Sequence, residues 1–158
     1  MDNYLLLKYI HIVCAIVLAG TGAGIAFFML MASRSKNIAV IAHTARFVVL
    51  ADWIFTTPAI IGQFITGILL MQRLQYSFSA PWFMCVISLF LFIGCCWVPV
   101  VFIQYQLKKL AEDAEQTGVL SDAFYRAMQY WIALGVPAFS GILMMLWLMI
   151  FKPLAMIQ

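Results

Sequence analysis

Charged residues are scarce in this sequence. Only 9% of its 158 residues are Asp, Glu, Lys or Arg, whereas 66% are hydrophobic. A soluble domain of this length carries about a quarter charged residues, which is what a hydrated surface requires. A water-soluble globular fold is therefore excluded, and the lipid bilayer is the expected surrounding of most of the surface. The polar connections are too short to hold a second domain, so we expect a single domain over residues 1–158.

The sequence also lacks the motifs of several functional classes. It has no basic run that could bind a nucleic-acid backbone, and its formal net charge is only +3. It has no phosphate-binding loop, no HExxH metal motif and no nucleophile elbow. No CxxC spacing occurs, and all four cysteines lie in apolar stretches, so we expect buried, unreactive thiols. These cysteines are Cys14, Cys85, Cys95 and Cys96.

Four long apolar stretches are the dominant feature of the chain. Each is long enough for a transmembrane helix, which needs about 20 apolar residues. They cover about 4–32, 48–71, 81–105 and 130–151. We therefore expect an all-α fold, a polytopic membrane bundle of four transmembrane helices. The moderately amphipathic segment 38–47 is expected to extend the second helix into the interface, and the polar segment 107–116 is expected to continue the third helix.

The distribution of Lys and Arg predicts the orientation. Six of these residues flank the first and third connections, and three lie on the opposite side. Because cytoplasmic loops are enriched in positive charge, both termini are expected outside, in a bacterial inner membrane with N-out and C-out topology. The six are Arg34, Lys36, Arg46, Lys108, Lys109 and Arg126, and the three are Lys8, Arg73 and Lys152.

Glycine and proline indicate how the helices pack. Gly20 and Gly24 have the spacing that lets two membrane helices approach closely, so a homo-oligomer or a membrane-protein partner is expected through the first helix. Pro58, Pro99 and Pro137 lie inside the second, third and fourth spans. Prolines kink membrane helices, and kinked helices can leave a pocket between them.

One group of polar residues is expected in the outer half of the bundle. Lys8 and His11 share a helix face, and Gln63, Thr66 and Lys152 lie at a similar depth on other spans. Polar groups in a span are costly and are functional candidates. A basic pocket with an imidazole suits an anionic amphiphile such as a porphyrin with its propionates. The alternative is that the lysines reach the headgroups and His11 makes one interhelical hydrogen bond.

A carboxylate is expected at the inner end of the second span. Asp52 lies just inside that span, and an unpaired charge there would destabilise it. We predict a structural ion pair between Asp52 and Arg126, with Arg46 as the other possible partner. A proton-relay role for Asp52 is the functional alternative.

The second histidine limits any haem site. His43 belongs to the cytoplasmic end, roughly 20 Å or more from His11 on helix rise alone. The two histidines therefore cannot ligate one iron within a single chain. A haem would need His11 with another kind of ligand, an open site, or a neighbouring subunit.

Several segments resemble a known family. YLLLKYIHI, ADWIFTTPAIIGQFITGILL, CWVPVVFIQYQLKKL and MIFKP are similar to the bacterial integral-membrane family called domain of unknown function 2269. That family is distantly similar to the HemJ four-helix protoporphyrinogen oxidases and, more loosely, to CopD. This resemblance implies His11 as a haem and metal ligand and Lys152 as a porphyrin contact. The third span lacks the histidines of HemJ, so the oxidation of a porphyrinogen is not implied.

These observations lead to three functional hypotheses, given in order of preference. The leading hypothesis is a membrane-embedded redox protein associated with haem b or a porphyrin. The second is a non-enzymatic accessory or assembly subunit whose polar residues are purely structural. The third is a small transporter or copper-uptake protein, since the sequence has ten methionines with soft thioether groups. No reaction, and so no catalytic residue, is assigned.

Overall fold

The part of the chain that the structure describes is helical except for short connections between the helices. The computed structural model describes residues 3–151, and the candidate contact Lys152 lies outside them. The second span is continuous but consists of three elements, with a π-helical turn in its middle. The elements are α1 (Asn3–Ser35), α2 (Ile38–Ala51), η1 (Asp52–Thr56), α3 (Thr57–Arg73), α4 (Pro81–Thr117) and α5 (Asp122–Phe151).

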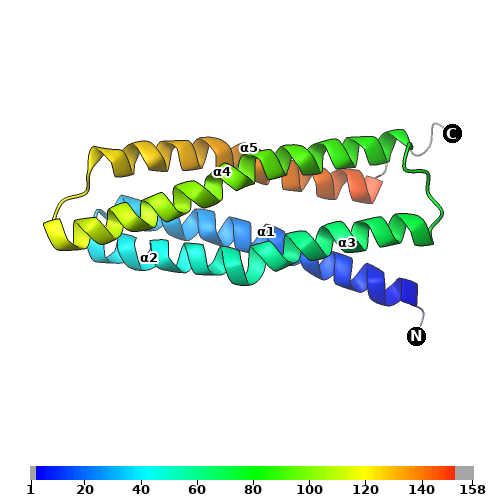
Figure 1. Cartoon of the computed structure of the whole chain (residues 1–158), viewed down its shortest axis with the longest axis horizontal. Coiled ribbons are helices and arrows are strands. Elements are labelled where there is room, and N and C mark those ends of the chain that lie inside the picture. Colours follow the sequence, from blue (N-terminus) through cyan, green and yellow to red (C-terminus); the bar gives the residue numbers. More distant parts are fainter. Residues whose placement is uncertain (1–2, 152–158) are drawn as a thin grey trace.

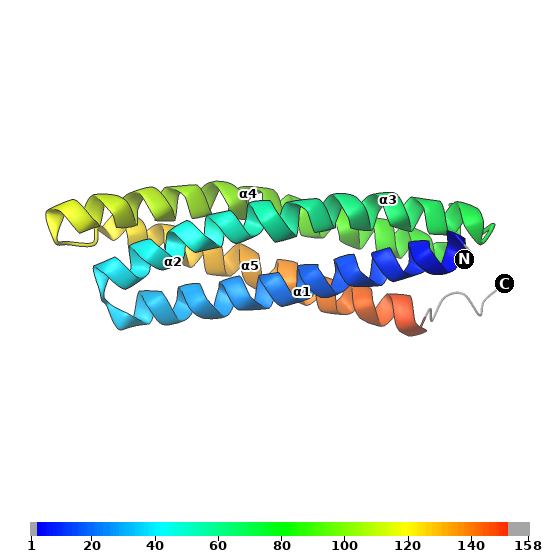
Figure 2. The same ribbon diagram turned by 90° about the horizontal axis from the view of Figure 1, so that it is seen from below.

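The helices form one elongated bundle (Figure 1). The α1–α2 and α4–α5 connections lie together at one end, which we call the connection end. The start of α1, the end of α5 and the α3–α4 loop lie at the other, which we call the terminal end. The view from below shows the same two ends (Figure 2). Helix α4 packs on α5 and α2, while α1 packs on α2 and α3.

Local sequence explains where the helices begin and end. The Asn37 side chain accepts a hydrogen bond from the backbone N–H of Val40 and caps the start of α2. Pro81 lies in the first turn of α4, where its missing N–H is not needed. Gly118 ends α4 with φ of +76°, a left-handed conformation that favours glycine. These signals fix the turns at the connection end and the start of α4.

The π-helical turn ends two residues before a proline. Pro58 has no N–H to donate to the carbonyl four residues earlier, so it interrupts the regular α-helical ladder. The helical turn contains one extra residue here, because the N–H of Thr57 bonds to the carbonyl of Asp52, five residues earlier. Such π-turns inside α-helices are frequent at functional sites. Asp52 opens this turn.

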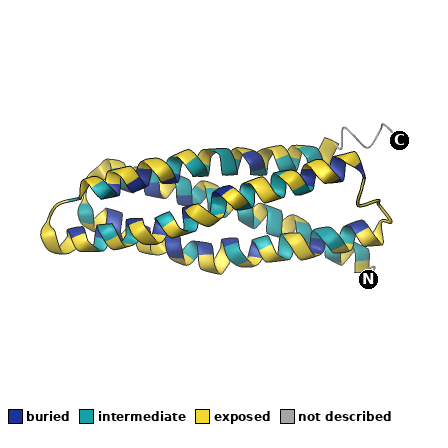
Figure 3. Ribbon diagram, turned by 45° about the horizontal axis from the view of Figure 1, so that its top comes forward, coloured by how far each residue is buried: buried dark blue, intermediate teal, exposed yellow. Residues whose placement is uncertain are grey.

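Two apolar cores hold the bundle together. The larger lies toward the connection end and includes Met29, Ile41, Leu107 and Phe124, all of which are almost completely buried. The smaller lies at the terminal end around Trp82. Along the remaining surface, exposed and partly exposed residues dominate (Figure 3). Because so many of the exposed side chains are large and apolar, this surface is suited to lipid and not to water.

The four predicted spans are confirmed as helices long and apolar enough to cross a membrane. The segments 38–47 and 107–116 do extend the second and third helices. Helix α5 begins at Asp122, eight residues before the predicted start at 130, because residues 122–129 continue the helix and contribute Phe124 to the larger core. The expectation of four buried thiols was wrong for Cys85 and Cys95. All four cysteines are free, but these two are exposed on α4.

Candidate functional site

The predicted outer group is partly assembled, around His11. His11 Nδ1 lies 2.8 Å from Thr66 Oγ1, and His11 Nε2 lies 3.0 Å from Gln63 Nε2. These contacts join α1 to α3 near the terminal end. The structure thus brings together three of the five residues that the sequence placed at this depth.

The hydrogen-bond network fixes the form of the imidazole. The Thr66 hydroxyl donates to the carbonyl of Gly62, so its oxygen accepts from His11 Nδ1–H. The Gln63 amide then donates to the lone pair on His11 Nε2. A neutral imidazole protonated at Nδ1 satisfies all three bonds. Both of its ring nitrogens are in use.

Glycines let α1 and α3 approach closely at this level. A Cβ added to Gly62 would lie 2.8 Å from Cys14 Sγ, and one added to Gly67 would lie 3.4 Å from His11 Cε1. Gly62 therefore tolerates no side chain unless Cys14 moves. The close packing holds the imidazole against α3.

Of the two lysines of the predicted group, Lys8 does not join it, and Lys152 lies outside the described residues. Lys8 is exposed, and its Nζ lies 6.0 Å from the centre of the Tyr4 ring. His11 presents the tautomer that a metal ligand would need, but Gln63 holds its Nε2. The residues as packed therefore do not fit a haem iron unless the Gln63 side chain turns away.

A second polar group lies around Asp52, roughly halfway along the bundle. Asp52, Thr56 and Gln104 are only 5%, 7% and 4% exposed. The side chains of Thr56 and Gln104 interact with the Asp52 carboxylate. Yet Asp52 Oδ2, Thr56 Oγ1 and Gln104 Oε1 have no partner at hydrogen-bonding distance and angle. Buried polar atoms are rarely left in this state, so the group needs a further ligand or water.

The predicted ion pair between Asp52 and Arg126 is not formed. Arg126 is exposed on α5, and no ion pair of Asp52 occurs within residues 3–151. Arg46, the other possible partner, instead bonds to Glu112 and Glu115 of α4. It can do so because α4 continues past the apolar span and carries these carboxylates alongside α2. Among the described residues, Asp52 thus forms no ion pair.

A cavity opens beside Asp52. It has a volume of about 180 Å³ and lies between the second span and α4. Pro58 is adjacent to one lining residue, Thr57, and Pro99 lies within the α4 segment that lines the other side. This agrees with the expectation that kinked helices leave a pocket. The lining residues are Val49, Asp52, Trp53, Thr57, Trp97, Val98, Val101, Phe102, Gln104 and Tyr105.

Aromatic side chains form much of the cavity wall. The Trp53 indole N–H donates to the Tyr105 hydroxyl at 2.5 Å, which links η1 to α4 across the seam. Phe102 is 70% exposed, so the cavity reaches the outside of the bundle along this seam. The buried indole N–H of Trp97 has no acceptor. The cavity therefore has a carboxylate, an amide and aromatic rings, and it opens sideways.

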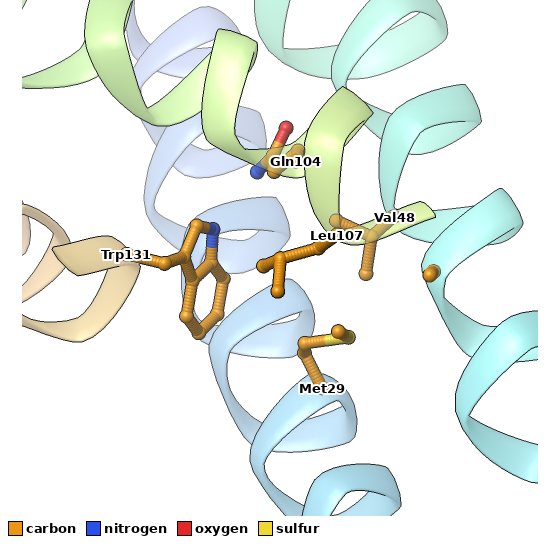
Figure 4. A pocket seen from close by; sticks show the side chains of 6 residues that line it. Met29, Val48, Gln104, Leu107 and Trp131 are labelled. Atoms are coloured by element: carbon orange, nitrogen blue, oxygen red, sulfur yellow. The ribbon is translucent and has the colours of Figure 1, made fainter. Parts of the chain in front are cut away.

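Gln104 separates this cavity from the main core. Figure 4 shows Gln104 together with Met29, Val48, Leu107 and Trp131, which converge from four helices. The gap that they enclose is too small for a water molecule. Gln104 also lines the lateral cavity, so its amide is held between a closed apolar core and an open polar site. This packing positions the amide beside Asp52.

Comparison with known proteins identifies the family. Residues 5–153 match the family described as "Predicted integral membrane protein (DUF2269)". The chain belongs to this family. No curated protein and no solved structure matches the chain significantly.

For this member of the DUF2269 family, sequence reasoning missed the cavity wall. The sequence singled out Asp52, but Trp53, Trp97 and Tyr105 gave no separate signal. Aromatic residues are ordinary in membrane helices, and only packing shows which of them surround a carboxylate. Pro58 and Pro99 were the available signal for space at this level. Within residues 3–151, no group of three or more His, Cys, Asp or Glu residues is placed so that it could hold a metal ion.

Proposed function

We propose that this chain is a membrane-embedded binding protein for a cationic ligand, with its functional centre at Asp52. The single observation that carries this proposal is a carboxylate that is 5% exposed, has no ion pair in the described chain, and faces a cavity of about 180 Å³. This function is closest to the transporter class, which the sequence placed third.

The charge balance supports a cation. Removing a carboxylate from water is strongly unfavourable unless another group compensates it. The described residues of the cavity lining include no Lys, Arg or His. Asp52 Oδ2 and Gln104 Oε1 are both unused acceptors in this lining. A ligand that brings positive charge or hydrogen-bond donors satisfies both atoms at once.

Thermal unfolding of the purified protein in a nonionic detergent tests this function. The Tm is measured with and without each of five added cations at constant ionic strength. These are Na⁺, K⁺, Mg²⁺, hexylammonium and hexyltrimethylammonium. A ligand at 100 times its Kd stabilises by about 2.7 kcal/mol, which raises the Tm by about 5–10 °C. We expect at least one cation to produce such a shift in the wild type.

Two variants make the test specific. Asp52→Asn should abolish the shift because it removes the charge and keeps the shape. Asp113→Asn removes the same charge from an exposed position on the same bundle and should leave the shift unchanged. If no cation stabilises the wild type more than Asp52→Asn, the proposed function fails. The accessory-subunit hypothesis then takes its place.

A haem or porphyrin at His11 is the second candidate. The observation that favours it is the hydrogen bond from His11 Nδ1 to Thr66, which leaves Nε2 as the nitrogen for an iron. Gln63 must release Nε2 before any iron can bind. Protein produced with ample haem should show a Soret band that His11→Ala removes and His43→Ala does not. Without a Soret band in the wild type, this candidate is rejected.

The location that we propose is the bacterial inner membrane, with the connection end in the cytoplasm. The six basic residues that flank the first and third connections support this orientation. Gly20 and Gly24 have no atoms within 4 Å of an added Cβ, so their faces of α1 are not used inside the bundle. These faces are therefore available for a close contact with a second copy or with another membrane protein.

A further inference from the structure

We propose that the cavity beside Asp52 binds the primary ammonium group of an amphiphile that enters from the bilayer. This inference rests on the proposed function and names the class of its ligand. An ammonium group –NH₃⁺ carries one positive charge and three N–H donors. The site offers the Asp52 carboxylate, and two oxygens of its lining, Asp52 Oδ2 and Gln104 Oε1, have no partner at hydrogen-bonding distance and angle.

The size of the cavity favours an organic group over a bare metal ion. Its volume of about 180 Å³ is far above the roughly 10–15 Å³ that a single water molecule requires. A single dehydrated ion would leave most of this space empty. An ammonium group with the first carbons of its chain would fill it.

The wall suits a cation that carries apolar groups. Trp53, Trp97, Phe102 and Tyr105 all line the cavity. The faces of aromatic rings attract ammonium groups, most strongly where water is excluded. Since Asp52 is the only acidic residue among the described residues of the lining, the ligand is expected to carry a single positive charge.

The opening determines the route of entry. Val98 and Phe102 line the cavity and are 49% and 70% exposed on the side of α4. In a bilayer these exposed side chains contact lipid tails, not water. An alkyl chain can lie along them while its ammonium group reaches Asp52. The ammonium can come from a free alkylamine or from the headgroup of phosphatidylethanolamine.

Calorimetric titration of the full chain in phosphatidylcholine vesicles tests the inference. The three probes are hexylammonium, hexyltrimethylammonium and hexanol, which share one alkyl chain. We expect saturable binding of hexylammonium, at least about tenfold weaker binding of the trimethyl probe because it has no N–H donors, and none of hexanol.

Two variants locate the binding site. Asp52→Asn should abolish hexylammonium binding, and Asp113→Asn should not change it. Trp97→Leu removes one aromatic wall and should weaken binding by about three- to tenfold. It provides an independent measurement if Asp52→Asn is poorly folded. Vesicles with phosphatidylethanolamine identify the source: weaker hexylammonium binding in them indicates the lipid headgroup, and unchanged binding indicates a free amine.

Several results would overturn the inference. Equal binding of hexylammonium and hexanol would show that the cavity takes apolar chains only. Hexylammonium binding that survives both Asp52→Asn and Trp97→Leu would place the amine elsewhere. Stabilisation by Na⁺ or K⁺ at Asp52 without hexylammonium binding would reject the ammonium and leave the proposed function standing. If no cation acts through Asp52, both proposals fail.

Discussion

Replacing Gly62 by alanine tests whether α1 and α3 are in close contact at the level of His11. The new Cβ would lie 2.8 Å from Cys14 Sγ, a distance that real Cβ atoms essentially never show. Overpacking of this kind costs about 1–3 kcal/mol, whereas alanine in a helix gains up to about 1 kcal/mol over glycine. The net effect of Gly62→Ala is therefore expected to be a loss of about 1 kcal/mol.

Gly94→Ala is the matched control. Gly94 is also helical, but nothing lies within 4 Å of its added Cβ. The intrinsic helix contribution is the same in both variants, so the difference between them isolates the contact with Cys14. That difference should be about 1–3 kcal/mol, or about 2–12 °C in Tm for a chain of this size. Thermal unfolding in detergent, followed by circular dichroism, measures it.

A second substitution decides whether Cys14 is responsible. Cys14→Ala removes the sulfur, and the double variant with Gly62→Ala should recover most of the lost stability. The coupling free energy between Gly62→Ala and Cys14→Ala should then equal the difference in stability between Gly62→Ala and its control. If Gly62→Ala is as harmless as Gly94→Ala, or if the effects of Gly62→Ala and Cys14→Ala are simply additive, the packing described for α1 and α3 is wrong.

Further predictions concern topology, the ion pairs and the histidine. A reporter placed at Glu115 should respond as cytoplasmic and tags at either terminus as periplasmic; the opposite result would reverse the proposed orientation. Arg126→Gln should change the Tm in detergent by less than about 1 °C, because its side chain is exposed and forms no ion pair in residues 3–151; a large loss would restore a role for Arg126 beside Asp52. Thr66→Val should destabilise by about 1 kcal/mol in thermal unfolding, since it leaves His11 Nδ1–H without an acceptor, and an unchanged Tm would argue against that hydrogen bond.

The depth of each polar residue was predictable from the sequence. The sequence placed His11, Gln63 and Thr66 at one level, and the structure joins them by hydrogen bonds. Depth follows from counting residues along a helix that must span the bilayer, because each residue adds a fixed rise. Lys8 was at a suitable depth as well, but its side chain lies outside this group.

The direction of each side chain around its helix was not predictable in the same way. Asp52 was expected to meet Arg126, yet the π-helical turn and the packing of α4 place it beside Thr56 and Gln104. One extra residue in a helical turn rotates everything beyond it, and hydrophobicity cannot reveal that rotation when every face of the helix is apolar. Pro58 marks the position of the irregular turn but does not set the direction in which Asp52 points.

The sequence by itself determined that four helices cross a membrane, because the bilayer requires long apolar segments whose backbone polar groups are bonded within each helix. Only the tertiary structure decided that Arg46 bonds to glutamates of α4 and leaves the Asp52 carboxylate unpaired in the described chain. It alone also decided that Trp53, Trp97 and Tyr105 surround that carboxylate. Which ion pairs form and which residues surround Asp52 depend on which helix faces pack together. In lipid nearly every helix face is apolar, so hydrophobicity does not select the faces that pack.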